Sequence, residues 1–157
     1  MTRWQRGFTL IELIATLTIL AILASLAFPV ADMTVRRMKE QELRHSLRTL
    51  RDGIDAYRKA WEEGRIGRKV GDNGYPPTLA RLIEGEDDLR YPDKRKIYFL
   101  RRIPTDPFAA PGQVAADSWG KRAYASSHDE PKEGDDVFDV YSRSEETGLN
   151  GIPYRRW

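Results

Sequence analysis

The feature that most constrains this chain is an apolar stretch near its N-terminus, from Phe8 to Ala31. Glu12 is the only charged residue within it, and Arg3 and Arg6 precede it. A membrane-spanning helix needs about 20 apolar residues, so the stretch is long enough to cross a bilayer once. The two arginines favour a cytoplasmic N-terminus, with the domain that follows on the far side. Charged residues are dense after residue 31, as in a soluble domain.

Composition limits the chemistry that the rest of the chain can carry. The 157 residues suffice for about one domain with a modest core. Because the chain has no cysteine, disulfides, thiolate zinc sites and thiol catalysis are excluded. The net charge of +2 equals the charge of the two arginines in the first seven residues. The remaining chain is therefore neutral overall and gives little sign of binding nucleic acid.

Three interpretations of the N-terminal segment compete. A secretory signal peptide has an apolar region of about 7–15 residues and then a small-residue cleavage site, and this stretch is longer. A plain membrane anchor agrees with the length and with the flanking charges. The third interpretation adds processing and assembly, and it depends on the residue order around Gly7.

Residues 7–13 read Gly-Phe-Thr-Leu-Ile-Glu-Leu. A short basic leader, a Gly-Phe pair and a glutamate four residues after the Phe closely resemble the cleavage site of type IV pilins and pseudopilins. The resemblance implies that prepilin peptidase cuts between Gly7 and Phe8. It also implies that the new amino group of Phe8 is N-methylated, and that Phe8 becomes the first residue of a long helix.

Glu12 is the residue of this segment with the clearest physical requirement. A carboxylate inside a membrane costs about 2.5–3.5 kcal/mol at mid-bilayer, so it usually has a partner. The resemblance implies that this partner is the amino terminus of a neighbouring subunit's Phe8; alternatively, Glu12 simply reaches the cytoplasmic interface. Pro29 removes a backbone donor and is expected to kink or locally melt the helix. The resemblance implies that Pro29 is a flexible point when the subunit enters a filament.

An apolar stripe with alternating steps of four and three residues continues the helical pattern beyond Pro29. Its members are Leu43, Leu47, Leu50, Ile54, Tyr57 and Trp61. The pattern predicts a helix from Phe8 to about Glu62, about 80 Å long. The stripe is shorter than a coiled coil requires, so we expect it to pack against the protein's own domain rather than against another helix.

Weaker local patterns organise the remainder of the chain. Glycines from Gly64 to Gly74 predict the end of the helix and a loop. A short helix follows, with Thr78 as its N-cap and Gly85 at its end. The segment 87–96 is charged and expected to be solvated. Two stretches read as strands, 122–126 and 137–142, with a weaker candidate at 97–100.

The middle and end of the chain resemble the G-type, or major, pseudopilin of type II secretion. The matching pieces are Tyr75-Pro76-Pro77-Thr78-Leu79, Ile103-Pro104-Thr105-Asp106-Pro107-Phe108, Asp117-Ser118-Trp119-Gly120 and Val137-Phe138-Asp139-Val140-Tyr141-Ser142. The resemblance implies an α+β, pilin-like fold in which the long helix packs on a small C-terminal antiparallel sheet. The expected parts are a cleaved leader at 1–7, an apolar membrane and assembly helix at 8–31, and a periplasmic domain at 32–157.

The segment before Trp157 departs from that family. G-type subunits usually carry there an acidic, glycine-rich loop that binds calcium, and the paired aspartates are missing from this chain. Hard oxygen ligands remain available, and calcium ligation by them is the weaker expectation beside a solvated loop with no cofactor. The candidate ligands are Ser142, Glu145, Glu146 and Asn150.

Three classes of function remain to be compared. Enzyme is the weakest, because His45 and His128 are isolated and no motif for catalysis or phosphate binding appears. DNA binding is a minor possibility, through basic runs such as 94–96 next to Tyr98 and Phe99, and no nucleic acid is expected.

The main prediction is a structural subunit, anchored once in a bacterial inner membrane, that assembles into a periplasmic pseudopilus of type II secretion. The resemblance implies as partners copies of itself, minor pseudopilins, prepilin peptidase and an inner-membrane assembly platform. The alternative is a subunit of a true type IV pilus, which serves adhesion, twitching or DNA uptake.

Overall fold

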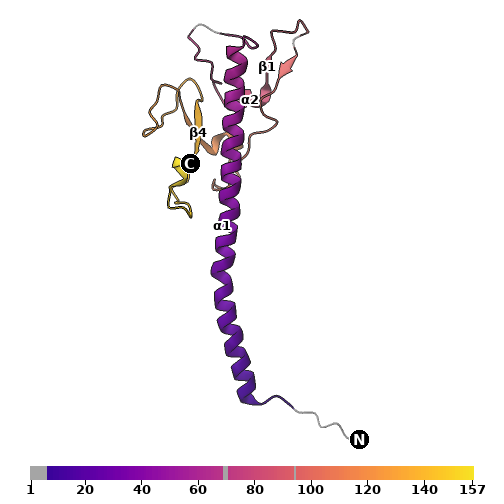
Figure 1. The fold of residues 1–157 in the computed structure, drawn as a ribbon, viewed down its shortest axis with the longest axis vertical. Helices are drawn as coiled ribbons and strands as arrows, with labels where there is room; N and C mark the ends of the chain where they lie inside the picture. Colours follow the sequence, from indigo (N-terminus) through magenta and orange to yellow (C-terminus); the bar gives the residue numbers. More distant parts are fainter. Residues whose placement is uncertain (1–6, 69–70, 94) are drawn as a thin grey trace. The chain divides into compact units, whose positions relative to one another are not determined.

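A computed structural model describes residues 7–68, 71–93 and 95–157, with the side chains of 26–31 outside the description. The chain divides into two compact units, Met1–Met38 and Lys39–Trp157. Helix α1, Leu10–Glu62, contributes residues to both (Figure 1). The helix predicted from Phe8 to about Glu62 is therefore confirmed, with its first turn starting two residues later.

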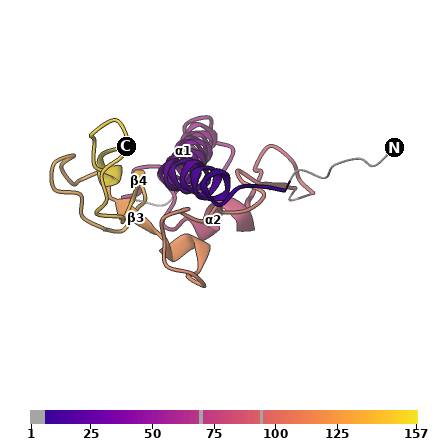
Figure 2. The ribbon, with the colours of Figure 1, turned by 90° about the horizontal axis from the view of Figure 1, so that it is seen from below.

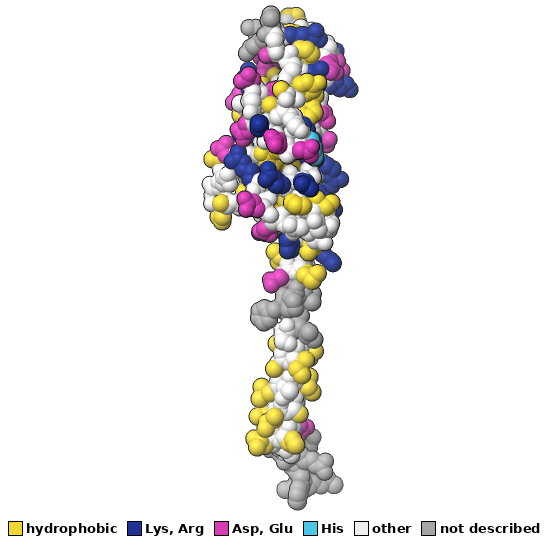
Figure 3. Space-filling view, turned by 90° about the vertical axis from the view of Figure 1, so that its left-hand side faces the viewer, with side chains coloured by type: hydrophobic (Ala, Val, Ile, Leu, Met, Phe, Trp, Pro, Cys, Tyr) yellow, Lys and Arg dark blue, Asp and Glu magenta, His cyan; other side chains and the backbone are white. Residues whose placement is uncertain are grey.

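The N-terminal unit presents its apolar side chains to the outside. Every residue from 7 to 25 is exposed, and hydrophobic side chains cover much of the described surface of this unit in Figure 3. The hydroxyls of Thr16, Thr18 and Ser25 donate to main-chain oxygens three or four residues earlier, at 2.8–2.9 Å. The hydrogen-bonding capacity of these hydroxyl donors is therefore used within the helix itself. Among the described residues, no helix combines the length and the apolar character of a membrane span.

The C-terminal unit builds its core on the predicted stripe of α1. Leu43, Leu47, Leu50 and Ile54 are at most 2 % exposed, which confirms that the stripe packs against the protein's own domain. The β3–β4 sheet (Trp119–Arg122 and Asp139–Ser142) and the chain's end lie to one side of α1. Helix α2 (Ala80–Glu84) and the β1–β2 hairpin (Glu86–Asp87 and Lys96–Ile97) lie to the other (Figures 1 and 2). The other buried hydrophobic residues of this core are Tyr57, Ala60, Ile66, Leu79, Leu82, Trp119, Val137, Val140 and Tyr154.

The smaller elements form two separate antiparallel pairs. Helix α2 is Ala80–Glu84, and β1, Glu86–Asp87, pairs with β2, Lys96–Ile97. Strand β3, Trp119–Arg122, pairs with β4, Asp139–Ser142. Single-turn 3-10 helices are η1, Ala115–Asp117, and η2, Tyr154–Arg156. The α+β, pilin-like prediction is confirmed.

Salt bridges and hydrogen bonds hold the β1–β2 hairpin to the end of α1. Buried Asp88 accepts from Arg65 at 2.7 Å, and this bond holds the pKa of Asp88 below its usual range. Burial raises the pKa of Tyr57 to about 12, with a further contribution from the neighbouring Glu86 carboxylate. The segment 87–96 was expected to be solvated; the structure shows that Asp88 within it is buried and paired with Arg65.

Two predictions of local structure were wrong. Leu79, not Thr78, occupies the N-cap position of α2, with no side-chain cap. The main-chain oxygen of Thr78 accepts from Arg81 instead, because Leu79 is turned into the core and the chain enters α2 through this tight turn. The predicted strand 122–126 starts earlier, at Trp119, and ends at Arg122, where the chain turns at Ala123 and Ser126.

The Trp119-Gly120 pair explains why β3 lies where it does. Trp119 is fully buried, and its indole Nε1 donates to the Pro104 oxygen at 2.8 Å. Gly120 lies opposite Tyr141 in β4, and a Cβ at residue 120 would lie 2.3 Å from the Tyr141 ring. Glycine is therefore required at residue 120, because the ring of its cross-strand partner covers the backbone there.

We expect Leu50→Ala to destabilise the C-terminal unit by about 2–5 kcal/mol, because Leu50 is fully buried in the core. Urea unfolding of the full chain in detergent, followed by tryptophan fluorescence, measures the change. Leu89→Ala is the matched control, since Leu89 is 64 % exposed and should change stability by less than about 0.5 kcal/mol. Equal effects at the two positions would contradict this assignment of the core.

Candidate functional site

Thr9 directly precedes α1 and lies two residues after Gly7, next to the predicted processing site. Its hydroxyl oxygen accepts from the Glu12 main-chain N–H at 3.3 Å, and its main-chain oxygen accepts from Leu13 at 3.1 Å. Thr9 is therefore the N-cap, and Glu12 is the third residue of the helix. The spacing Thr-x-x-Glu is the sequence signature of a capped helix start, a signal that the sequence analysis missed.

Gly7 and Phe8 precede this cap in a part of the chain without regular secondary structure. Both are exposed, with Phe8 at 77 %, and among the described residues no atom beyond the chain neighbours lies within 4 Å of a Cβ built on Gly7. Together with Thr9 and Glu12 they line an open hollow at the start of α1. A peptide bond in exposed, non-helical chain is accessible to a protease, so the geometry is compatible with cleavage between Gly7 and Phe8.

Glu12 lies in the first turn of α1 with its side chain exposed. Negative charge is favoured there by the positive end of the helix dipole. Within the described residues it forms no ion pair, so its pairing with Phe8 of a neighbouring subunit stays a prediction. α1 continues through Pro29, but the side chains around it lie outside the described residues, and the predicted flexibility at Pro29 stays untested.

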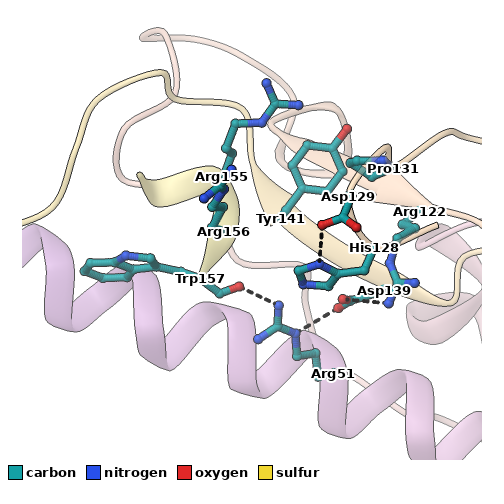
Figure 4. Close-up of a pocket in the computed structure, with 10 residues that line it drawn as sticks. All are labelled: Arg51, Arg122, His128, Asp129, Pro131, Asp139, Tyr141, Arg155, Arg156 and Trp157. Atoms are coloured by element: carbon teal, nitrogen blue, oxygen red, sulfur yellow. Dashed lines mark hydrogen bonds and ion pairs between the residues drawn. The ribbon is translucent and has the colours of Figure 1, made fainter. Parts of the chain in front are cut away.

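The C-terminal unit has a second polar site around Arg51, which sequence reasoning did not single out. Its guanidinium donates to Asp139 Oδ1 at 2.8 Å, to the Val140 oxygen at 3.2 Å and to the Trp157 oxygen at 2.8 Å. Figure 4 shows this guanidinium between β4 and the chain's end. Arg51 of α1 thus holds β4 and the C-terminal residue Trp157, both of which are distant from α1 in sequence.

A cavity of about 270 Å³ opens beside Arg51 (Figure 4). Arg122 donates to Asp139 from the far side, at 3.3 Å. His128 contributes its ring, with Nδ1 at 3.8 Å from the Asp129 carboxylate, and both side chains are largely exposed. Among the described residues that line the cavity there is no serine, threonine or cysteine for His128 to activate, so the arrangement does not resemble a histidine-activated hydroxyl or thiol. His45 is exposed as well.

The predicted calcium ligands have other partners or point to solvent. The hydroxyl of fully buried Ser142 donates to Asp106 Oδ2 at 2.5 Å and accepts from the Ser144 N–H. Asn150 Oδ1 accepts from the Ile152 N–H at 3.0 Å. Glu145 and Glu146 are exposed. In the described part of the chain, no three histidine or acidic side chains gather as a metal site would require.

The basic residues considered for DNA binding serve structural contacts in part. Lys96 donates to the Glu84 oxygen at 3.2 Å. Tyr98 is 62 % exposed, whereas Phe99 packs against Tyr57 in the core at 5.1 Å between ring centres. Phe99 is therefore not available to stack on a base.

A capped, apolar helix start joined to a pilin-like α+β domain defines a class of protein. Residues 5–28 match the family model described as the prokaryotic N-terminal methylation motif. In this motif and in its α+β fold the chain is similar to type IV pilin-like proteins.

The similar proteins of known name include several type II secretion system core proteins G. The chain is 28% identical over 123 residues to type II secretion system core protein G of Dickeya chrysanthemi, covering 74% of this chain and 71% of that one. It is 29% identical to the protein of the same name from Aeromonas hydrophila, over 71% of this chain and 73% of that one. The Pseudomonas aeruginosa protein is 28% identical, over 73% and 75%. No solved structure matches. The chain is thus similar to G-type pseudopilins, as its sequence motifs predicted.

We expect Arg51→Met to loosen β4 and the chain's end from α1, at a cost of about 1–3 kcal/mol, because three hydrogen bonds from one charged group are lost. Hydrogen exchange at Val140 and Trp157, together with urea unfolding, measures the change. Arg48→Met is the control: Arg48 is exposed, and among the described residues its side chain donates only within its own helix, to the Arg44 oxygen. Unchanged exchange in Arg51→Met would contradict the role of Arg51.

Proposed function

We propose that this chain is a structural subunit of the pseudopilus that drives protein export by a type II secretion system. The observation that carries the proposal is the methylation motif at residues 5–28, on a chain whose similarity to core protein G extends over about 70% of its length. In this role the chain performs no catalysis, and the chemistry is done to it. Prepilin peptidase cleaves between Gly7 and Phe8, and Phe8 is N-methylated.

The exposed apolar surface supports the membrane and filament parts of the proposal. Residues such as Leu10, Ile14 and Leu17 are 55–77 % exposed. Such a surface in water is unfavourable by about 25 cal/mol per Å², so it needs lipid or other helices around it. We therefore assign residues 8–31 to the inner membrane before assembly, with the leader in the cytoplasm and the domain in the periplasm.

Assembly then exchanges lipid contacts for contacts with copies of the same chain. Cleavage before Phe8 creates an amino group four residues from Glu12, and the two pair between neighbouring subunits. The ion pair offsets the cost of holding a carboxylate among apolar helices. Minor pseudopilins and an inner-membrane assembly platform are the further partners in this proposal, and Pro29 allows the helix to adjust as the subunit leaves the bilayer.

Deletion of the gene tests the function directly. We expect specific exoproteins to stay in the periplasm while surface pili and twitching are unchanged, and complementation to restore export. Protein profiles of the culture supernatant and electron microscopy of pili are the two measurements. Normal export with lost pili or motility would instead make the chain a type IV pilus subunit.

Glu12→Leu tests the assembly mechanism. The variant should insert, and should be cleaved and methylated at Phe8, because the Gly-Phe pair is intact. Filament yield should fall by at least about tenfold, the factor that corresponds to a loss of about 1.4 kcal/mol per subunit contact. Mass spectrometry of the N-terminus and sheared-filament assays separate processing from assembly.

Glu42→Leu is the matched control, since Glu42 is an exposed carboxylate on the same helix. It should assemble normally. Wild-type filament yield from Glu12→Leu would refute the pairing, whereas failed cleavage would show that Glu12 acts earlier, in processing.

A further inference from the structure

The C-terminal segment 146–157 closes on itself through its backbone. The Gly148 N–H donates to the Ile152 oxygen at 2.9 Å, and the Tyr154 N–H donates to the Glu146 oxygen at 3.0 Å. Gly148 is buried at the closure, where an added Cβ would meet the Trp157 ring at 2.5 Å. This C-terminal loop is therefore tightly packed, and its shape depends on what fixes it to α1.

Glu40 connects the C-terminal loop to α1. It lies in α1 at the start of the C-terminal unit. Its side chain is buried, with 6 % of the residue exposed. Its Oε1 accepts from the Leu149 N–H at 2.7 Å and from the Tyr154 hydroxyl at 3.0 Å, although these residues lie 109 and 114 positions further along the chain. A carboxylate that accepts two donors forms strong, charge-assisted hydrogen bonds.

Tyr154, which Glu40 holds through its hydroxyl, also packs against two aromatic side chains. Its ring stacks on Phe108 with 4.2 Å between centres and meets the edge of Trp157 at 5.0 Å. The Arg44 guanidinium lies over Trp157 from the α1 side, at 4.4 Å. Glu40 therefore positions the loop through Leu149 and Tyr154, and the loop in turn positions Trp157.

A calcium ion is the alternative way to fix such a loop, as the family resemblance implies. Calcium needs six to eight oxygen ligands at 2.3–2.6 Å. The oxygens of Ser142 and Asn150 that sequence analysis offered already serve protein hydrogen bonds, as does Glu40 Oε1. Among the described residues, Glu40 forms no ion pair, and no carboxylate cluster lies beside it. The donor set therefore does not fit a calcium ion.

We propose that the buried Glu40 carboxylate, and not a bound cation, fixes the C-terminal loop of this protein to α1. The loop reaches its folded form without calcium, and Glu40 is a positioning residue for residues 149–157. This inference concerns the folded subunit alone and does not depend on which filament the subunit builds.

Thermal unfolding of the full chain in detergent, with EDTA or with excess calcium chloride, tests the cation directly. We expect the same Tm in both, and equal hydrogen exchange at the Leu149 amide. Glu40→Ala should lower Tm by about 5–10 °C and speed exchange at Leu149 at least tenfold, because both donors lose their acceptor. Tyr154→Phe removes one donor but keeps the ring, so its Tm should fall by less.

Glu42→Ala is the control, an exposed glutamate two residues along the same helix that should leave both readouts unchanged. A rise in Tm or slower Leu149 exchange on adding calcium to the wild-type chain would overturn the proposal. So would a Glu40→Ala chain that behaves like Glu42→Ala. If Glu40→Ala does not fold, the wild-type calcium comparison and the Tyr154→Phe chain still decide the question.

Discussion

Burial of one face of α1 is the constraint on which the C-terminal unit depends. Leu43, Leu47, Leu50 and Ile54 form the wall of the core against which the later segments pack. The two sheets are pairs of two and four residues, and an isolated two-stranded sheet is at best marginally stable in water. Each pair therefore owes its stability to the helix beneath it.

Charged residues of the same helix determine where the last segments lie. Arg51 donates to β4 and to Trp157, and Glu40 accepts from Leu149 and Tyr154. A donor and an acceptor placed three turns apart hold both parts of the C-terminal segment. Such bonds add little to hydrophobic stability but select one arrangement, because a buried polar group left without its partner is costly. In the proposed filament this arrangement would present the same surface on every subunit.

The strongly periodic parts of the fold were predictable from the sequence, and the short paired parts were not. The α1 stripe repeats over five turns, so its burial could be predicted from Leu43 to Ile54. Strand β3 was placed too late, because Gly120 argues against a strand until its cross-strand partner Tyr141 is known. Thr78 is a good N-cap by residue type, yet the burial of Leu79 decided how the chain enters α2.

The features that sequence alone established are local and continuous along the chain. The Gly-Phe pair, Glu12 and the apolar stretch all fall within residues 7–31, because the proposed processing and membrane insertion would act on a contiguous segment. The contacts of Glu40 and Arg51 emerged only from the folded structure. They join residues 88 to 114 positions apart, and no local pattern records which distant donor or acceptor the chain will bring to a buried charge.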